Sequence, residues 1–221
     1  MRTLDFPAHP GRSAPTLLVL LQGAYSAPED FIHHGFIDAL RQTGAPVDVV
    51  LADNDPRYVS EGCVAMRVEE DVIQPRRQAG QRLWLAGISL GAFSALAWAS
   101  QYPDGIDGIC LIAPYPGTQE VLRPIREASS LAAWAAQPRP ANEDDEHRVW
   151  RWLADWHFRR HSPTLWFGTG ETDRFRAGQD QIAALLPPTQ VHTVAGGHDW
   201  PQWRALWQRF LAQKLLHGSA P

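Results

Sequence analysis

Six short apolar runs recur along the chain with helix-like segments between them, and this alternation limits the available folds more than any other feature. Most of the runs are continuous rather than alternating in polarity, as expected for strands covered on both faces. The runs are Leu17–Leu21, Val47–Ala52, Leu83–Ala86, Ile109–Ala113, Leu165–Gly168 and Val191–Val194. Strands that alternate with helices predict an α/β fold with a mostly parallel central sheet of about six or seven strands, flanked by helices. Residues 1–13 are a candidate for one extra edge strand, and Pro28–Gln42 and Ser60–Gln78 are among the predicted helices.

The length and composition suit one domain with a sizeable core. The chain has 221 residues, of which 44% are hydrophobic and 20% charged, and a net charge of -4. The negative balance gives no basic surface for nucleic acid or for an anionic membrane. Residues 1–15 lack the apolar core of a signal peptide, and no apolar run is long enough to cross a bilayer. The expected partner is therefore a small molecule in the cytoplasm, and the oligomeric state is left open.

The cysteines and histidines do not form a metal-ligand pattern. Cys63 and Cys110 are far apart in the sequence, and Cys110 lies in a strand-like run where a buried, inert thiol is expected. His33 and His34 are adjacent in a predicted helix, so their side chains point in different directions. The sequence therefore predicts no metal site.

A Gly-x-Ser-x-Gly sequence at residues 87–91 follows the third apolar run directly. An Ala-rich predicted helix, Leu90–Tyr102, begins at the end of this sequence. This strand–turn–helix context is that of a nucleophile elbow, a sharp turn with a serine at its tip. Gly87 and Gly91 stand where a Cβ would meet the neighbouring strand or helix. Ser89 is therefore the candidate nucleophile.

A serine nucleophile needs a base to accept its proton and an acid to orient that base. The candidate base is His198, in a Gly-Gly-His-Asp-Trp loop between the last predicted strand and the final helix. The candidate acid is Asp173, in the Gly-rich loop after the fifth predicted strand, and Glu171 in the same loop is the alternative. The three candidates follow the order serine, acid, histidine that accompanies an elbow of this kind.

Backbone amides beside Ser89 are candidates for an oxyanion hole. The amide of Leu90 lies at the start of the predicted helix, whose positive dipole end points at the reacting centre. The second donor is expected in the loop after the first predicted strand, where Ala24 is the first choice and Tyr25 the alternative. Tyr25 and Trp200 are also candidate substrate-binding residues.

With these motifs the chain resembles the α/β-hydrolase superfamily from Leu17 to about Leu216, and in particular its small bacterial esterases and hydrolases. Residues 196–200 are similar to the histidine loop of the esterase D group. The resemblance implies a mostly parallel sheet that lacks one or both leading antiparallel strands of larger members. It implies neither a metal nor an organic cofactor. Gln22 stands where many relatives have histidine, which is a departure in the predicted oxyanion loop.

Residues 115–162 depart from the simple alternation, because two helix-like stretches precede the fifth predicted strand. Two interpretations are open for this segment of the single domain 1–221. It forms either a small helical cap whose aromatic residues line an acyl pocket, or packing helices whose aromatic residues are buried against the sheet. Those residues include Trp150, Trp152 and Trp156.

Together these residues predict a serine hydrolase that cleaves carboxylic esters through an acyl-enzyme. An acyl thioesterase or acyltransferase would use the same triad, and so would a peptidase or amidase. A non-catalytic binding protein of the same fold is the alternative from a different class.

Asp53, Asp55 and Tyr58 follow the second predicted strand and are either pocket residues or part of a turn that begins a helix.

Overall fold

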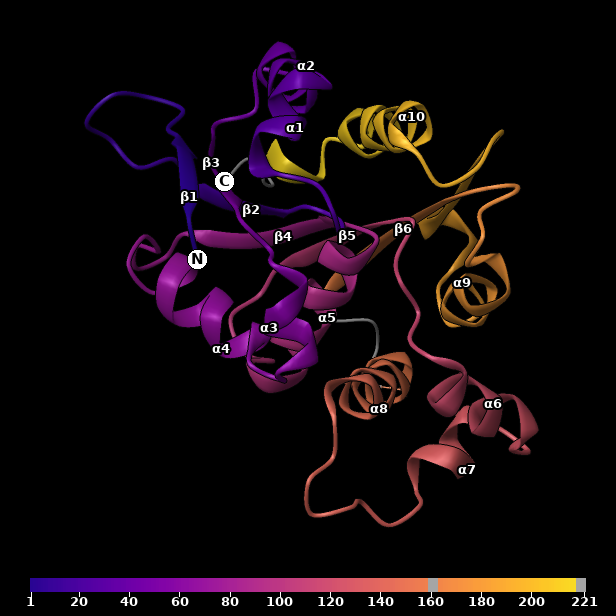
Figure 1. Ribbon diagram of the computed structural model, residues 1–221. Coiled ribbons are helices and arrows are strands. Elements are labelled where there is room, and N and C mark those ends of the chain that lie inside the picture. Colours follow the sequence, from indigo (N-terminus) through magenta and orange to yellow (C-terminus); the bar gives the residue numbers. More distant parts are fainter. Residues whose placement is uncertain (159–162, 218–221) are drawn as a thin grey trace.

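The computed structural model describes residues 1–158 and 163–217. A seven-stranded sheet runs through its centre in the order β1-β3-β2-β4-β5-β6-β7 (Figure 1). β1 pairs antiparallel with β3, and the remaining pairs are parallel. The strands are β1 (Thr3–Phe6), β2 (Thr16–Leu21), β3 (Val47–Ala52), β4 (Arg82–Ile88), β5 (Gly108–Ile112), β6 (Thr164–Gly170) and β7 (Val191–Val194).

Helices cover both faces of the sheet (Figure 1). One face carries α1 (Pro28–His33), α2 (Phe36–Gln42) and α10 (Trp200–Ala212). The other carries α4 (Val64–Val68), α5 (Leu90–Gln101), α8 (Asp145–Phe158) and α9 (Arg176–Ala183). The remaining elements are α3 (Pro56–Ser60), a π-helical turn (Glu69–Ile73), α6 (Gln119–Glu127), α7 (Leu131–Ala135) and two 3₁₀ turns (Pro188–Gln190 and Leu215–His217). Among residues 1–158 and 163–217, no helix is long and apolar enough to cross a membrane.

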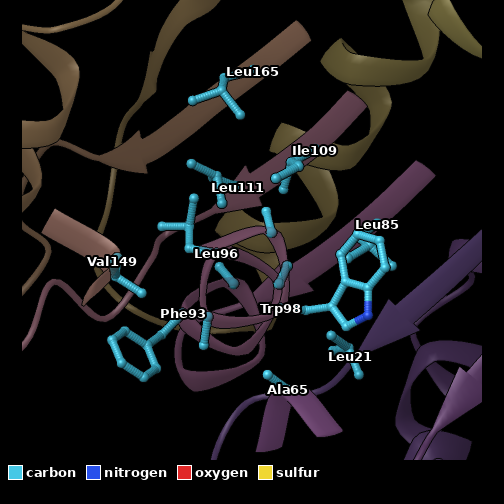
Figure 2. Close-up of a cluster of buried hydrophobic side chains, with 14 of the residues drawn as sticks. Leu21, Ala65, Leu85, Phe93, Leu96, Trp98, Ile109, Leu111, Val149 and Leu165 are labelled. Carbon is cyan, nitrogen blue, oxygen red and sulfur yellow. The ribbon is translucent and has the colours of Figure 1, made fainter. Parts of the chain in front are cut away.

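Each face of the sheet has its own hydrophobic core, and α5 lies at the centre of one of them. Figure 2 shows Phe93, Leu96 and Trp98 of α5 among side chains of β4, β5 and β6. Every residue of α5 from position 91 to position 99 is buried, so this helix is apolar on all sides, as expected for a helix inside a core. The β4–α5 unit, which carries the predicted elbow, is therefore firmly packed.

The sheet agrees with the sequence prediction. All six predicted strands are present as β2 to β7, and their residues are mostly buried because helices cover both faces. The expected edge strand within residues 1–13 is also present, since β1 pairs with β3 from Thr3 opposite Ala52 to Phe6 opposite Val49. The mostly parallel α/β fold is thus confirmed.

Two segments that were predicted to be single helices are each divided in the structure. Residues 28–42 form two helices because Gly35, with φ at 72°, takes a left-handed conformation that ends one and begins the other. Residues 60–78 are similarly divided, since Gly62 has φ at 67° and a π-helical turn follows α4. Apolar periodicity continues across both breaks, which explains why the pattern alone suggested single helices.

Residues 115–158 form three helices, α6, α7 and α8, and α8 packs against α5. Two helix-like stretches were predicted here, and the first is divided because the backbone turns extended at Ala128. Trp150 and Trp156 are buried in the core of that face, and the indole N–H of Trp150 donates to the carbonyl of Pro116 at 2.9 Å. These two rings therefore pack in the core, as one of the two interpretations expects. A cap movement of this segment stays a prediction, and its residues 159–162 lie outside the described part.

Candidate active site

Ser89 occupies a strained turn between β4 and α5. Its φ of 53° and ψ of -114° lie where residues other than glycine are rare, at a cost of about 1–3 kcal/mol. Four backbone hydrogen bonds hold this conformation. The amide of Ser89 donates to Ile112, and its carbonyl accepts from Ala92, Phe93 and Tyr115. The end of β5 and the loop after it therefore help to keep the serine at the tip of the turn.

Both glycines of the Gly-x-Ser-x-Gly sequence are required by close backbone contacts. A Cβ on Gly87 would lie 2.2 Å from the carbonyl carbon of Gly91. A Cβ on Gly91 would lie 2.0 Å from the carbonyl oxygen of Leu21 at the end of β2. The serine, the start of α5 and the end of β2 can pack together only because these side chains are missing.

The structure brings Ser89, Asp173 and His198 together at the carboxyl ends of β4, β6 and β7. His198 Nε2 lies 2.9 Å from Ser89 Oγ, and His198 Nδ1 lies 2.7 Å from Asp173 Oδ2. A hydrogen on Nδ1 would be donated to the carboxylate and would leave Nε2 free to accept the serine proton. Glu171, the alternative acid, is exposed in the same loop. The carboxylate that contacts the imidazole is thus that of Asp173.

The Asp173 carboxylate is fully enclosed by its partners. Burial by itself raises the pKa of Asp173, but hydrogen bonds from His198 and from the Phe175 amide outweigh burial and hold that pKa below its ordinary value. Gln179 also contributes to the lowered pKa of Asp173. Asp173 is therefore ionised at neutral pH, in the form that orients and stabilises an imidazolium.

Two aromatic rings flank the imidazole of His198. Phe175 meets it edge-on at 5.1 Å between ring centroids, and Trp203 does so at 5.2 Å. Rings on two sides restrict the rotation of the imidazole. Sequence reasoning missed this role, although the short spacing of Phe175 from Asp173 and of Trp203 from His198 was a signal for it.

The predicted oxyanion loop lies beside the serine. A Cβ on Gly23 would be 3.5 Å from Ser89 Cβ, so the loop passes beside the serine directly before Ala24. Leu90 is the first residue of α5. Tyr25 has φ at 62° and a fully exposed side chain. The two predicted donor residues therefore belong to two segments that meet at Ser89.

A buried polar network joins these two segments, and it was missed by sequence reasoning. Asn54 lies two residues after β3 and is 0% exposed. Its Nδ2 donates to the Gln22 carbonyl at 3.3 Å, and its Oδ1 accepts from Ser94 Oγ at 3.1 Å. Gln22 Nε2 donates to Asp53 at 3.0 Å. The sequence shows only that Asn54 lies two residues after a predicted strand that ends at this sheet edge.

The turn after β3 begins a helix, as one interpretation expected. Asp55 accepts a hydrogen bond from the amide of Arg57 at 2.9 Å and caps α3. Tyr58 packs against the core. The cap and the packing account for both side chains without a pocket.

Trp200, a candidate substrate residue, is already engaged in aromatic contacts. Its ring stacks on His34 at 4.2 Å with 7° between the planes, and it meets Phe31, Phe36 and Trp203 edge-on.

Within residues 1–158 and 163–217, no group of three or more His, Cys, Asp or Glu side chains is placed to hold a metal ion. The polar groups at the site are thus those of a serine–histidine–carboxylate arrangement.

A family model described as "Putative esterase" matches residues 70–215, which include all three residues of the candidate triad. The chain belongs to this esterase family. Membership makes it a hydrolase of the carboxylesterase type. Comparison with curated protein sequences gave no match.

Solved structures similar to this esterase show the same fold at low sequence identity. Fluorophosphonate-binding serine hydrolase F of Staphylococcus aureus has a TM-score of 0.65 and 16% identity, over 93% of this chain and 86% of that one. S-formylglutathione hydrolase of Staphylococcus aureus has a TM-score of 0.62 and 14% identity, over 90% and 81%. A monoacylglycerol lipase of Paleococcus ferrophilus has a TM-score of 0.60 and 15% identity, over 98% and 99%. The esterase therefore has the α/β-hydrolase fold.

Proposed function

We propose that this esterase cleaves carboxylic esters through an acyl-enzyme formed on Ser89, with His198 as the base and Asp173 as the acid. The observation that carries the proposal is the continuous hydrogen-bond chain from Asp173 through His198 to Ser89, with contacts of 2.7 and 2.9 Å. Such contacts are within the range in which a proton can be transferred. The strained backbone of Ser89 and the burial of Asp173 add support, since both are typical of a built catalytic site.

In the first half-reaction, Ser89 Oγ attacks the ester carbonyl carbon while its proton passes to His198 Nε2. The ionised Asp173 stabilises the imidazolium that forms. Negative charge develops on the carbonyl oxygen, and the amides of Leu90 and Ala24 are the proposed donors to it. When the tetrahedral intermediate collapses, His198 gives the proton to the leaving alcohol and the acyl group stays on Ser89.

In the second half-reaction, water replaces the alcohol. His198 removes a proton from water while the water oxygen attacks the acyl carbon, and the same two amides stabilise the second oxyanion. When this intermediate collapses, His198 returns the proton to Ser89 Oγ and the acid product leaves. Tyr25 is proposed to contact the substrate because its exposed ring directly follows the donor residue Ala24. Trp200 is proposed as a second contact on its position two residues after His198.

Thioester hydrolysis is a second candidate, which the similarity to S-formylglutathione hydrolase favours. The same triad would act, with a thiol rather than an alcohol as the leaving group. Parallel assays on p-nitrophenyl esters of graded chain length and on acyl-CoA thioesters separate the two. A higher kcat/KM for the esters supports the main proposal, and a higher value for the thioesters overturns it in favour of the second.

The triad is tested by Ser89→Ala and His198→Ala in the p-nitrophenyl ester assay. We expect each variant to lose at least about 10³-fold in kcat, because the triad acts as a unit. Glu171→Gln is the matched control, since it removes the neighbouring carboxylate that does not contact His198. Full activity of Ser89→Ala would exclude the mechanism.

A further inference from the structure

We infer that Asn54 is a positioning residue for the oxyanion hole, where it holds the two donor segments at a fixed separation. This inference rests on the proposed function, because it concerns the same site. The two proposed donors come from different elements. Ala24 lies in the loop after β2, and Leu90 is the first residue of α5. Stabilisation of an oxyanion requires both amides to stay within hydrogen-bond distance of one point, so any drift between the segments lowers the rate.

Asn54 bridges these segments with both ends of its amide. Its Nδ2 donates to the carbonyl of Gln22, two residues before Ala24, at 3.3 Å. Its Oδ1 accepts from Ser94 Oγ at 3.1 Å. The single Ser94 hydroxyl proton is shared between this oxygen and the carbonyl of Leu90, which lies 2.9 Å away. The link thus runs from the oxyanion loop to Ser94, about one turn after Leu90 in α5.

The backbones of the same two segments also contact each other directly, beside the hydrogen bonds of Asn54. A Cβ on Gly91 would lie 2.6 Å from the carbonyl oxygen of Gln22. This is the carbonyl that accepts from Asn54. Asn54 therefore fixes the orientation of a peptide group that is pressed against the first turn of α5.

Burial makes these hydrogen bonds strong. Asn54 and Ser94 are both 0% exposed, so loss of either partner leaves a buried polar group unsatisfied. The side chain of Gln22 makes the other hydrogen bond that holds the loop, and its acceptor is Asp53, which is partly exposed and also contacts Arg2. Solvent weakens this hydrogen bond, so the buried hydrogen bond from Asn54 holds the loop more firmly.

The test compares Asn54→Ala with Gln81→Ala, a matched loss of a buried amide far from the site. Gln81 is 6% exposed, donates to the Ala14 carbonyl at 2.8 Å and accepts from the Gln78 amide at 3.1 Å. It precedes β4, at the end of the strand opposite Ser89. Both variants should lower the melting temperature, since each removes two side-chain hydrogen bonds that are buried or partly buried.

Only Asn54→Ala should change the chemistry. We expect its kcat to fall by about 10- to 100-fold with KM within about 2-fold of wild type, because a misplaced donor is lost in the transition state alone. The inhibition constant of a trifluoromethyl ketone, whose Ser89 adduct carries an oxyanion, should rise by a similar factor. Gln81→Ala should keep both values. An Asn54→Ala kcat equal to that of Gln81→Ala, or a loss confined to KM, would overturn the inference.

Ser94→Ala gives an independent test if Asn54→Ala does not fold. It removes the helix side of the bridge, so kcat should fall by about 3- to 10-fold with KM unchanged. An unchanged kcat in a folded Ser94→Ala protein counts against the bridge. Failure of the proposed function looks different, because wild type itself would then show no Ser89-dependent ester turnover.

Discussion

His198 Nε2 lies 2.9 Å from Ser89 Oγ although 109 positions separate the two residues in the chain. Parallel β4 and β7 end at the same edge of the sheet, and the loops that leave them meet there. The nucleophile–base contact is therefore built into the sheet order. Such pre-organisation lowers the barrier by removing a reorganisation step.

Replacement of the proposed acid should leave the fold intact and remove most of the activity. Asp173→Asn keeps the shape of the side chain but no longer favours the His198 tautomer that accepts the serine proton. We expect a loss of about 10⁴-fold in kcat at neutral pH, the size seen for this change in other triads. Steady-state kinetics on a p-nitrophenyl ester measures it, and a loss under about 10-fold would point to another acid.

The same carboxylate should contribute a pH-dependent share of the stability. The folded-state pKa of Asp173 is lowered, so its ionised form stabilises the protein above the ordinary aspartate pKa, and this contribution is lost as the pH falls through the folded-state pKa. The difference in unfolding free energy between wild type and Asp173→Asn should be constant above about pH 5 and shrink below about pH 4. Urea unfolding across that range measures it. A difference that grows as the pH falls would contradict the assigned direction.

Glycine at position 91 should be indispensable. Gly91→Ala places a methyl group 2.0 Å from the Leu21 carbonyl, so α5 or β2 must shift. We expect a destabilisation of about 3 kcal/mol or more, with loss of ester hydrolysis. In Gly197→Ala the nearest atoms would be 3.8 Å from the new methyl group, so its melting temperature should change little. Equal melting temperatures for the two variants would exclude the steric explanation.

Glu146 should stabilise the loop that supports Ser89 from β5. Its carboxylate accepts from the Tyr115 hydroxyl at 3.1 Å and from the Thr118 amide at 2.8 Å, and the Tyr115 amide holds the Ser89 carbonyl. Glu146→Ala should lower the unfolding free energy by about 1.5–3 kcal/mol. Glu127→Ala, which removes an exposed carboxylate 4.0 Å from Arg123, should change it by less than about 0.5 kcal/mol. Urea unfolding tests both, and equal effects would contradict the role of Glu146.

The sheet was predictable because its strands are continuous apolar runs, and covered parallel strands leave that signature directly in the sequence. The candidate site was predictable for a related reason. Ser89, Asp173 and His198 each follow such a run, and parallel strands bring their carboxyl ends to one edge. The helix breaks were not predictable from apolar periodicity, because at Gly35 and Gly62 the backbone changes while the periodic pattern continues.

Contacts between distant segments were also beyond sequence reasoning. Asn54 reaches Gln22 and Ser94 across 32 and 40 positions, and no local pattern marks such a bridge. Phe175 and Trp203 are close in sequence to Asp173 and His198, but their edge-on contacts with the imidazole are seen only in the folded geometry. The cytoplasmic location stays a prediction.

Labelling of Ser89 by a fluorophosphonate tests the central claim most directly. The probe reacts with a serine only when a base activates it, so intact-protein mass spectrometry of the folded wild type should show one adduct, and peptide mapping should place it on Ser89. Ser89→Ala should not be labelled, and His198→Ala should react at least about 10³-fold more slowly. A folded wild-type protein that stays unlabelled, or an adduct on another residue, would contradict the account.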